Sequence, residues 1–123
     1  MIKVGTDIIE VKRIMDSIEK YGENFIKKVF TSGEVEYCKK FKHSGERFAG
    51  KFAAKESVQK ALMSILPETT FPLHQIEIQN DEYGRPIVIL QGSLEKFNHI
   101  YTLETSVSHI KEMATATTIL VGK

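Results

Sequence analysis

The spacing of hydrophobic and polar residues changes along the chain and divides it into two halves. Apolar side chains recur at helical spacing through most of residues 11–66, and the period changes after residue 72, where residues 74–79 show the two-residue alternation of a strand. One further strand is predicted at residues 2–11, where β-branched side chains are concentrated. Helices grouped in the first half and strands in the second predict an α+β fold with an antiparallel sheet packed with a long helix.

In the first half the pattern predicts three short helices and a long one, over residues 11–22, 24–30, 31–41 and 44–66. The third helix begins with Thr31 and Glu34, which have the spacing of a capping box. Pro67 ends the long helix, because proline cannot continue the hydrogen-bond ladder.

In the second half we expect strands at residues 74–79, 87–90, 105–110 and 113–122, a turn at 80–86 and a short helix at 92–100. The loop at residues 67–72 is bounded by two prolines and is too short to link two domains. With no internal repeat, the 123 residues predict a single domain, 1–123.

Composition argues against several classes of protein. The net charge of +1 lacks the strong basic excess typical of nucleic-acid binding, although it leaves room for a local basic patch. The first ten residues contain Asp7 and Glu10 and no long apolar run, so neither a signal peptide nor a membrane span is expected there. The only cysteine, Cys38, cannot form a disulfide within the chain, which favours a reducing, cytoplasmic setting and a free structural thiol.

The long helix carries an unusual set of charges among small residues. Ala49, Ala53, Glu56 and Lys60 fall in one sector of its surface, and the alanines would leave space beside the carboxylate. A carboxylate and a lysine one turn apart suit a magnesium–phosphate complex. The same pair is also typical of a solvent-exposed i,i+4 ion pair, and spacing alone leaves both interpretations open.

Two more residues are candidates for chemistry. Asp7 lies in an apolar strand, where an ionised carboxylate needs a hydrogen bond, a cation or a strand end, although it could also cap the next helix. His109 ends a predicted strand beside Ser108, and a lone histidine of this kind is often structural. The chain has no zinc-ligand spacing, no Walker or dinucleotide glycine motif and no nucleophile elbow.

Four stretches together resemble one family, the holo-acyl-carrier-protein synthases, which are small 4′-phosphopantetheinyl transferases. They are "GTDIIEVKRI", "FAGKFAAKESVQKAL", "IEIQNDEYGRP" and "SVSHIKEMATATTIL", in the family's order and over nearly the whole chain. The resemblance implies the phosphopantetheinyl transferase fold and a homotrimer with active sites between subunits. It implies magnesium-dependent transfer of 4′-phosphopantetheine from coenzyme A to a serine of an apo acyl carrier protein, with release of 3′,5′-ADP.

The resemblance also implies roles for individual residues. Asp7 and Glu56 match the family's metal ligands, and together with Lys60 and His109 they are the expected catalytic residues. The expected coenzyme A contacts are Lys51, Lys55, Lys60, Ser64, Ser108 and His109. Arg13 matches a position that contacts the acidic carrier protein. The proton acceptor for the carrier serine stays open among His109, a carboxylate and a metal-bound water.

The chain departs from the family pattern near the cofactor. Met63 and Ile65 replace two usual glycines, Lys51 replaces a usual arginine and Ile110 a usual threonine. These changes leave a second hypothesis, a weakly active or non-catalytic relative that binds coenzyme A or a carrier protein. A third is a structural domain whose charges are only solvated. The sequence does not distinguish a carrier for fatty acid biosynthesis from one of another pathway.

Overall fold

The computed structural model describes residues 1–123 and confirms an α+β architecture. The helices are α1 (Val11–Tyr21), α2 (Glu23–Val29), α3 (Ser32–Lys39) and α4 (Ser44–Met63), with 3-10 segments η1 (Leu73–Gln75) and η2 (Gly92–His99). The strands are β1 (Ile2–Glu10), β2 (Ile76–Asn80), β3 (Pro86–Leu90), β4 (Tyr101–His109) and β5 (Met113–Gly122). The long helix stops three residues before the predicted Leu66, and β4 begins four residues before its predicted start at residue 105.

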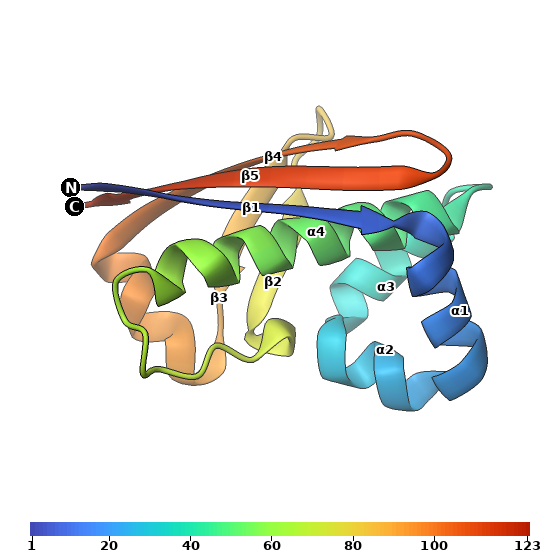
Figure 1. Cartoon of the computed structure of the whole chain (residues 1–123), viewed down its shortest axis with the longest axis horizontal. Coiled ribbons are helices and arrows are strands. Elements are labelled where there is room, and N and C mark those ends of the chain that lie inside the picture. Colours follow the sequence, from blue (N-terminus) through green and yellow to red (C-terminus); the bar gives the residue numbers. More distant parts are fainter.

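Two antiparallel sheets form the β part of the molecule. β1, β5 and β4 make a three-stranded sheet in that order, and β2 and β3 form a separate hairpin. Figure 1 shows the larger sheet as one layer, with α4 running along it and α1–α3 gathered beneath one end. Because β5 lies between the other two strands, β1 and β4 are the opposite edges of this sheet.

The core lies between α4 and the inner face of the three-stranded sheet. Ala49, Ala53 and Ala61 of α4 are fully buried, and on the sheet side Ala114 and Ala116 are almost fully buried. Small side chains on both partners allow the helix to lie close to the strands. The expectation that Ala49 and Ala53 leave space for a ligand is therefore wrong, because these alanines are packed in the interior.

The predicted capping box is present and connects to the interior. Thr31 Oγ1 accepts a hydrogen bond from the Glu34 backbone N–H (3.2 Å), and the Thr31 N–H donates to Glu34 Oε1 (2.9 Å). Glu34 Oε1 also accepts from Lys55 Nζ at 2.6 Å, and Lys55 Nζ donates to the Ile76 carbonyl at 2.6 Å. One carboxylate thus ties the start of α3 to the middle of α4 and the start of β2.

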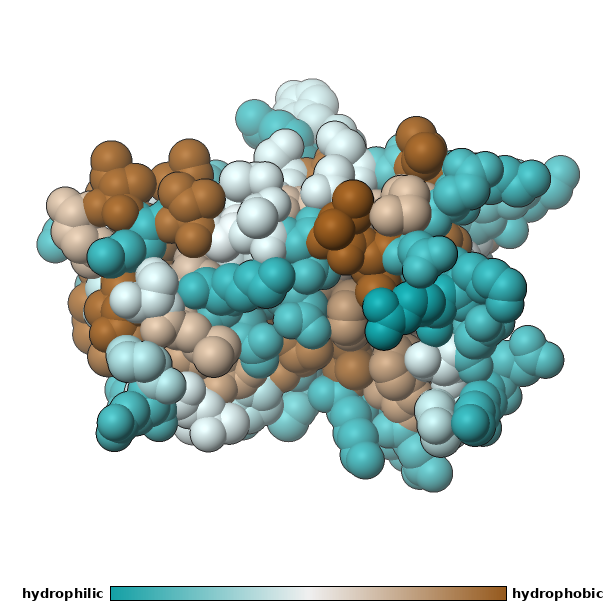
Figure 2. All heavy atoms as spheres, in the orientation of Figure 1, coloured by the Kyte–Doolittle hydropathy of each residue, from teal (hydrophilic) through white to brown (hydrophobic).

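The outer face of the three-stranded sheet carries an exposed apolar strip near the two chain ends. Ile2 pairs across the strands with Val121, and Val4 with Ile119, and all four are exposed. Brown side chains gather over this end of the sheet in Figure 2. A contiguous exposed apolar face of this kind is typical of a surface that contacts another protein.

No helix in the structure combines the length and the apolar character that crossing a bilayer requires. The thiol of Cys38 is fully buried, and this burial raises its pKa to about 12. A thiol with so high a pKa is unreactive at neutral pH, which agrees with a structural role.

Candidate active site

Asp7 and the two charged residues of α4 form the first cluster. Asp7 lies on β1, opposite Ala116 of β5, on the face of the sheet that packs against α4. The ammonium of Lys60 donates to the Thr6 carbonyl at 2.9 Å and lies 3.3 Å from Asp7 Oδ1. The N-terminal strand and the last turn of α4 therefore bring an aspartate and a lysine into contact across 53 residues of sequence.

Glu56 belongs to the same cluster. Burial raises the pKa of the Glu56 carboxyl, the charge of Asp7 raises it further, and Lys60 opposes both effects. Asp7 is thus close enough to Glu56 for the two carboxylates to repel each other. Two carboxylates whose charges interact, with one lysine beside them, leave an excess of negative charge, which favours binding of a cation.

A magnesium ion fits this cluster. Asp7 Oδ2 is buried and has no hydrogen-bond partner in the structure, although buried polar atoms are nearly always paired. No group of three or more His, Cys, Asp or Glu side chains is placed to share a metal. Asp7 and Glu56 therefore offer two oxygen-bearing side chains, the number at which magnesium relies on water and phosphate oxygens for its remaining ligands.

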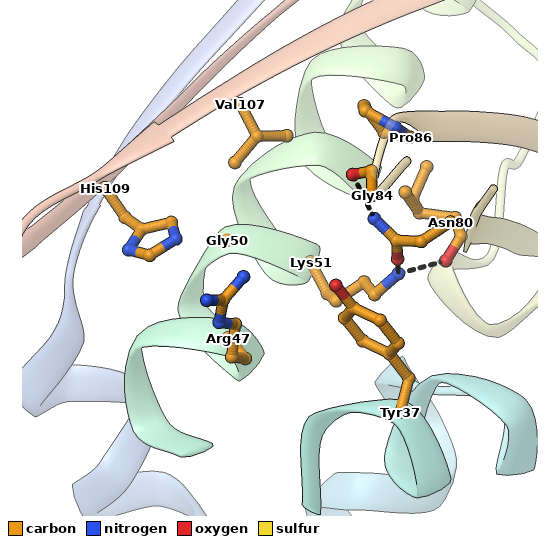
Figure 3. Close-up of a pocket in the computed structure, with 10 residues that line it drawn as sticks. Tyr37, Arg47, Gly50, Lys51, Asn80, Gly84, Pro86, Val107 and His109 are labelled. Carbon is orange, nitrogen blue, oxygen red and sulfur yellow. Dashed lines mark hydrogen bonds between the residues drawn. The ribbon is translucent and has the colours of Figure 1, made fainter. Parts of the chain in front are cut away.

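A second cluster lies around a cavity of about 130 Å³ on the other side of α4. Its wall includes Tyr37 of α3, Arg47 and Lys51 of α4, Asn80 at the end of β2 and His109 at the end of β4. Figure 3 shows these side chains converging from four elements. No carboxylate lines the cavity, so its charge is positive and suits an anionic ligand.

Lys51 is held firmly within this cluster. Its ammonium donates to Asn80 Oδ1 and to the Ile78 carbonyl, and lies 4.5 Å from the centre of the Tyr37 ring (Figure 3). Burial lowers the pKa of Lys51, and the Glu34 carboxylate opposes that effect. Lys51 is only 5% exposed, so it presents little of its charge directly to a ligand.

Arg47 has the more available charge. It forms no ion pair and lies over the Phe41 ring at 3.9 Å. In Figure 3 its guanidinium points into the space between His109 and Lys51. Arg47, Tyr37 and Asn80 were not among the residues predicted from the sequence. The four-residue spacing of Arg47, Lys51 and Lys55 was the signal available for a basic stripe on one side of α4.

One expected coenzyme A contact, Lys55, is corrected by the structure, and a second, Ser108, lies apart from its expected neighbour His109. Lys55 is fully buried and bonded to Glu34 and the Ile76 carbonyl, so its charge serves the core rather than a ligand. Ser108 and His109 were expected to line one cleft, but adjacent strand residues point to opposite faces. Ser108 is exposed on the outer face of the sheet, whereas His109 lines the cavity on the inner side.

The remaining expected residues lie where a ligand or partner can reach them. Ser64 is exposed at the end of α4, one turn beyond Lys60, and its hydroxyl donates to the Ala61 carbonyl at 2.6 Å. Arg13 is exposed on α1 and makes no ion pair.

The two clusters lie apart within one chain. The first, with Asp7, Glu56 and Lys60, is on the β1 side of α4, whereas His109 of the second is on β4, at the opposite edge of the sheet. One chain therefore does not bring His109 to the first cluster.

The chain is similar to known proteins over nearly its whole length. Residues 3–118 match the family model described as the 4′-phosphopantetheinyl transferase superfamily. The holo-[acyl-carrier-protein] synthase of Clostridium novyi is 47% identical over 124 residues, covering 98% of this chain and 87% of that protein. The Leptospira biflexa enzyme of the same name is 37% identical over 122 residues, covering 97% and 95%.

Solved structures agree with the sequence comparison. A holo-(acyl-carrier-protein) synthase from Bacillus anthracis in complex with CoA (3′,5′-ADP) superposes with a TM-score of 0.76 at 31% identity, covering 96% of this chain and 94% of that one. The ACPS–CoA complex of Chronobacterium ammoniagenes has a TM-score of 0.86 at 24% identity, covering 100% and 98%. The second likeness, at this low identity, shows a shared fold.

Proposed function

This chain belongs to the holo-[acyl-carrier-protein] synthase family of 4′-phosphopantetheinyl transferases, and from that premise we propose that it modifies an apo acyl carrier protein with coenzyme A as co-substrate. The serine oxygen of the carrier forms a bond to the phosphorus that bears pantetheine. The bond from that phosphorus to the bridging oxygen breaks, and 3′,5′-ADP leaves with the bridging oxygen. The proposal covers residues 1–123 as one transferase domain, acting in the cytoplasm, where Cys38 stays reduced.

The observation that supports this chemistry best is the unpartnered, buried Oδ2 of Asp7 beside Glu56 and Lys60. Magnesium bound by Asp7 and Glu56 would supply positive charge to the pyrophosphate oxygens as charge develops on the leaving nucleotide. Lys60, which already lies at this cluster, would neutralise a further phosphate oxygen as a point charge. Ser64, one turn along α4, would contact the same part of coenzyme A.

The cavity around Arg47, Lys51 and His109 supplies a second subsite, which would bind an anionic group of the ligand. Its cationic wall suits a phosphate group of coenzyme A, and in the proposal His109 also remains a candidate acceptor for the carrier serine proton. Arg13 on α1 would contact the acidic carrier protein. The carrier could belong to fatty acid synthesis or to another pathway that uses a phosphopantetheine arm.

We propose that the two clusters form one site between neighbouring chains of a homotrimer. They lie at opposite edges of the three-stranded sheet, with β5 between them, so a single chain presents two incomplete halves. The exposed apolar strip of Ile2, Val4, Ile119 and Val121 gives the sheet a face suited to contact another copy. The number three comes from the family resemblance.

The direct test is a transfer assay with intact-mass detection. The protein is incubated with coenzyme A, magnesium and a panel of apo carrier proteins, and a phosphopantetheine mass gain on a carrier is expected together with 3′,5′-ADP. Asp7→Asn should abolish the gain, while the matched surface variant Glu36→Gln should retain it, since Glu36 is exposed on α3. No gain on any carrier, with binding of coenzyme A intact, would instead favour a binding protein without turnover.

A further inference from the structure

Glu46 is a partly buried carboxylate with one polar partner, the ring of His109. It lies in the first turn of α4, and its Oε1 is 3.2 Å from His109 Nδ1. The two side chains are 22% and 27% exposed. The contact joins the start of α4 to the end of β4, across 63 residues of sequence.

The chemistry of this contact determines where the imidazole holds its proton. An ionised carboxylate only accepts hydrogen bonds, so Nδ1 must be the donor. In the neutral ring the proton on Nδ1 leaves Nε2 as a lone-pair acceptor. The structure gives Nε2 no hydrogen-bond partner, so this nitrogen is available to a ligand or a substrate proton.

The surroundings of the ring leave that nitrogen accessible from the cavity. Gly50 lies next to His109, and a Cβ there would sit 3.9 Å from ring atom Cδ2 and 3.3 Å from Val107 Cγ1. His109 lines the cavity, whereas Glu46 does not. The carboxylate therefore sits behind the ring, where it can orient His109 without presenting a negative charge to an anionic ligand.

We infer that Glu46 is a positioning residue of the transferase site, which holds His109 in the Nδ1–H tautomer and directs Nε2 to the cavity beside Arg47 and Lys51. The inference deepens the proposed function and rests on it for its effect on turnover. Carboxylate partners of this kind commonly fix the tautomer and orientation of functional histidines.

The chain contains a matched control for this pair. His99 Nε2 lies 3.4 Å from Glu95 Oε1 in η2, where both side chains are well exposed and belong to neither cluster. Glu95→Ala removes a histidine–carboxylate contact of similar length from the surface. It should change neither turnover nor the state of His109.

The first measurement is independent of activity. Histidine ring nitrogens are labelled with ¹⁵N and their chemical shifts recorded near pH 9, above the ordinary imidazole pKa. His109 should show the Nδ1–H tautomer in the wild type and in Glu46→Gln, whose amide oxygen can still accept the bond. Glu46→Ala should shift the tautomer equilibrium of His109 toward the Nε2–H form. An unchanged tautomer in Glu46→Ala would overturn the inference.

The second measurement is a double-mutant cycle on turnover. Glu46→Ala should lower kcat about tenfold or more, in the range seen when the orienting partner of a histidine is removed. The same change in a His109→Ala background should cost nothing further, because its effect acts through the ring. An equal loss in both backgrounds would show that Glu46 acts structurally. Full activity of His109→Ala would contradict the proposed role of His109 itself, and the tautomer result would still decide whether Glu46 orients the ring.

Discussion

Gly5 of β1 lies directly against the backbone of Ser57 in α4. A Cβ at Gly5 would sit 1.9 Å from the Ser57 carbonyl oxygen and 2.7 Å from the Ala61 nitrogen. This contact is two residues from Asp7 and one residue from Glu56. The close approach of strand and helix therefore sets the separation of the two carboxylates.

Gly5→Ala should destabilise the fold and disrupt the carboxylate pair together. The added methyl group meets backbone atoms, which cannot rotate away, so β1 must move from α4 at a cost of about 3 kcal/mol in the free energy of unfolding. Urea denaturation measures this cost, and Mn²⁺ binding by electron paramagnetic resonance measures the metal site. Wild-type Mn²⁺ affinity in a folded Gly5→Ala protein would contradict the role of the contact.

A matched change on the partner separates packing from hydrogen bonding. Ser57 Oγ is buried and lies 2.7 Å from Thr118 Oγ1, which donates to Thr105 Oγ1 at 3.0 Å. Ser57→Ala keeps the backbone contact and removes only the hydroxyl, so it should cost about 1–2 kcal/mol and leave Mn²⁺ affinity unchanged.

Breaking the buried Glu34–Lys55 pair on one side should destabilise the fold strongly, although neither residue contacts a proposed ligand. Lys55→Met leaves the Glu34 carboxylate buried without its cation, which should cost about 3–5 kcal/mol in the free energy of unfolding. Replacing both residues by Gln and Met should cost less than the sum of the single changes. Additive costs measured by urea denaturation would show that the two charges are not coupled.

The surface pair of Lys12 and Asp16 is the control for that experiment. Their charged atoms are 2.8 Å apart, but both side chains are exposed, so the pair lies in solvent and its energy is screened. Lys12→Ala should leave the free energy of unfolding measured by urea denaturation close to that of the wild type.

Glu56 should make the metal-free protein less stable as the pH rises. Burial and Asp7 raise the pKa of Glu56 above its ordinary value, so the folded state binds its proton more tightly than the unfolded state does. This contribution to stability is fully present below the ordinary pKa of 4.5 and is lost as the pH rises through the raised pKa.

Glu56→Gln should therefore raise the Tm of the metal-free protein at pH 7 and remove the stabilisation that added magnesium gives the wild type. Differential scanning calorimetry with EDTA or with magnesium provides both values. Lys60→Ala should have the opposite effect on the metal-free protein, because it removes the cation that offsets the two carboxylates. A lower Tm for metal-free Glu56→Gln than for the wild type would contradict this account.

Local rules predicted most of the fold, and the failures have local causes. The capping box of Thr31 and Glu34 and the α+β order followed from spacing and turn chemistry. Periodicity did not reveal that Lys55 is buried, because a lysine in an i,i+4 basic stripe has the same pattern whether it meets water or Glu34. The separation of His109 from Asp7 depends on strand order, which pairs β5 with both β1 and β4, and this order is a long-range property.

Because β1 and β4 are opposite edges of the sheet, two inactive variants, one altered on each strand, should restore activity when their chains assemble together. Asp7→Asn damages the cluster on β1, and His109→Ala damages the cavity at the end of β4. If each site takes Asp7 from one chain and His109 from its neighbour, co-expressed chains contain some sites with neither change. Transfer activity measured on the co-purified assembly should then exceed that of either variant alone.

The control uses two changes in the same half-site. Asp7→Asn and Glu56→Gln both alter the β1 cluster, so every site in a mixed assembly of these variants keeps one damaged carboxylate and activity should stay at the level of the single variants. Restoration by the first mixture and not by the second would require the site to span two chains. Equal behaviour of the two mixtures would contradict a site that takes Asp7 from one chain and His109 from its neighbour.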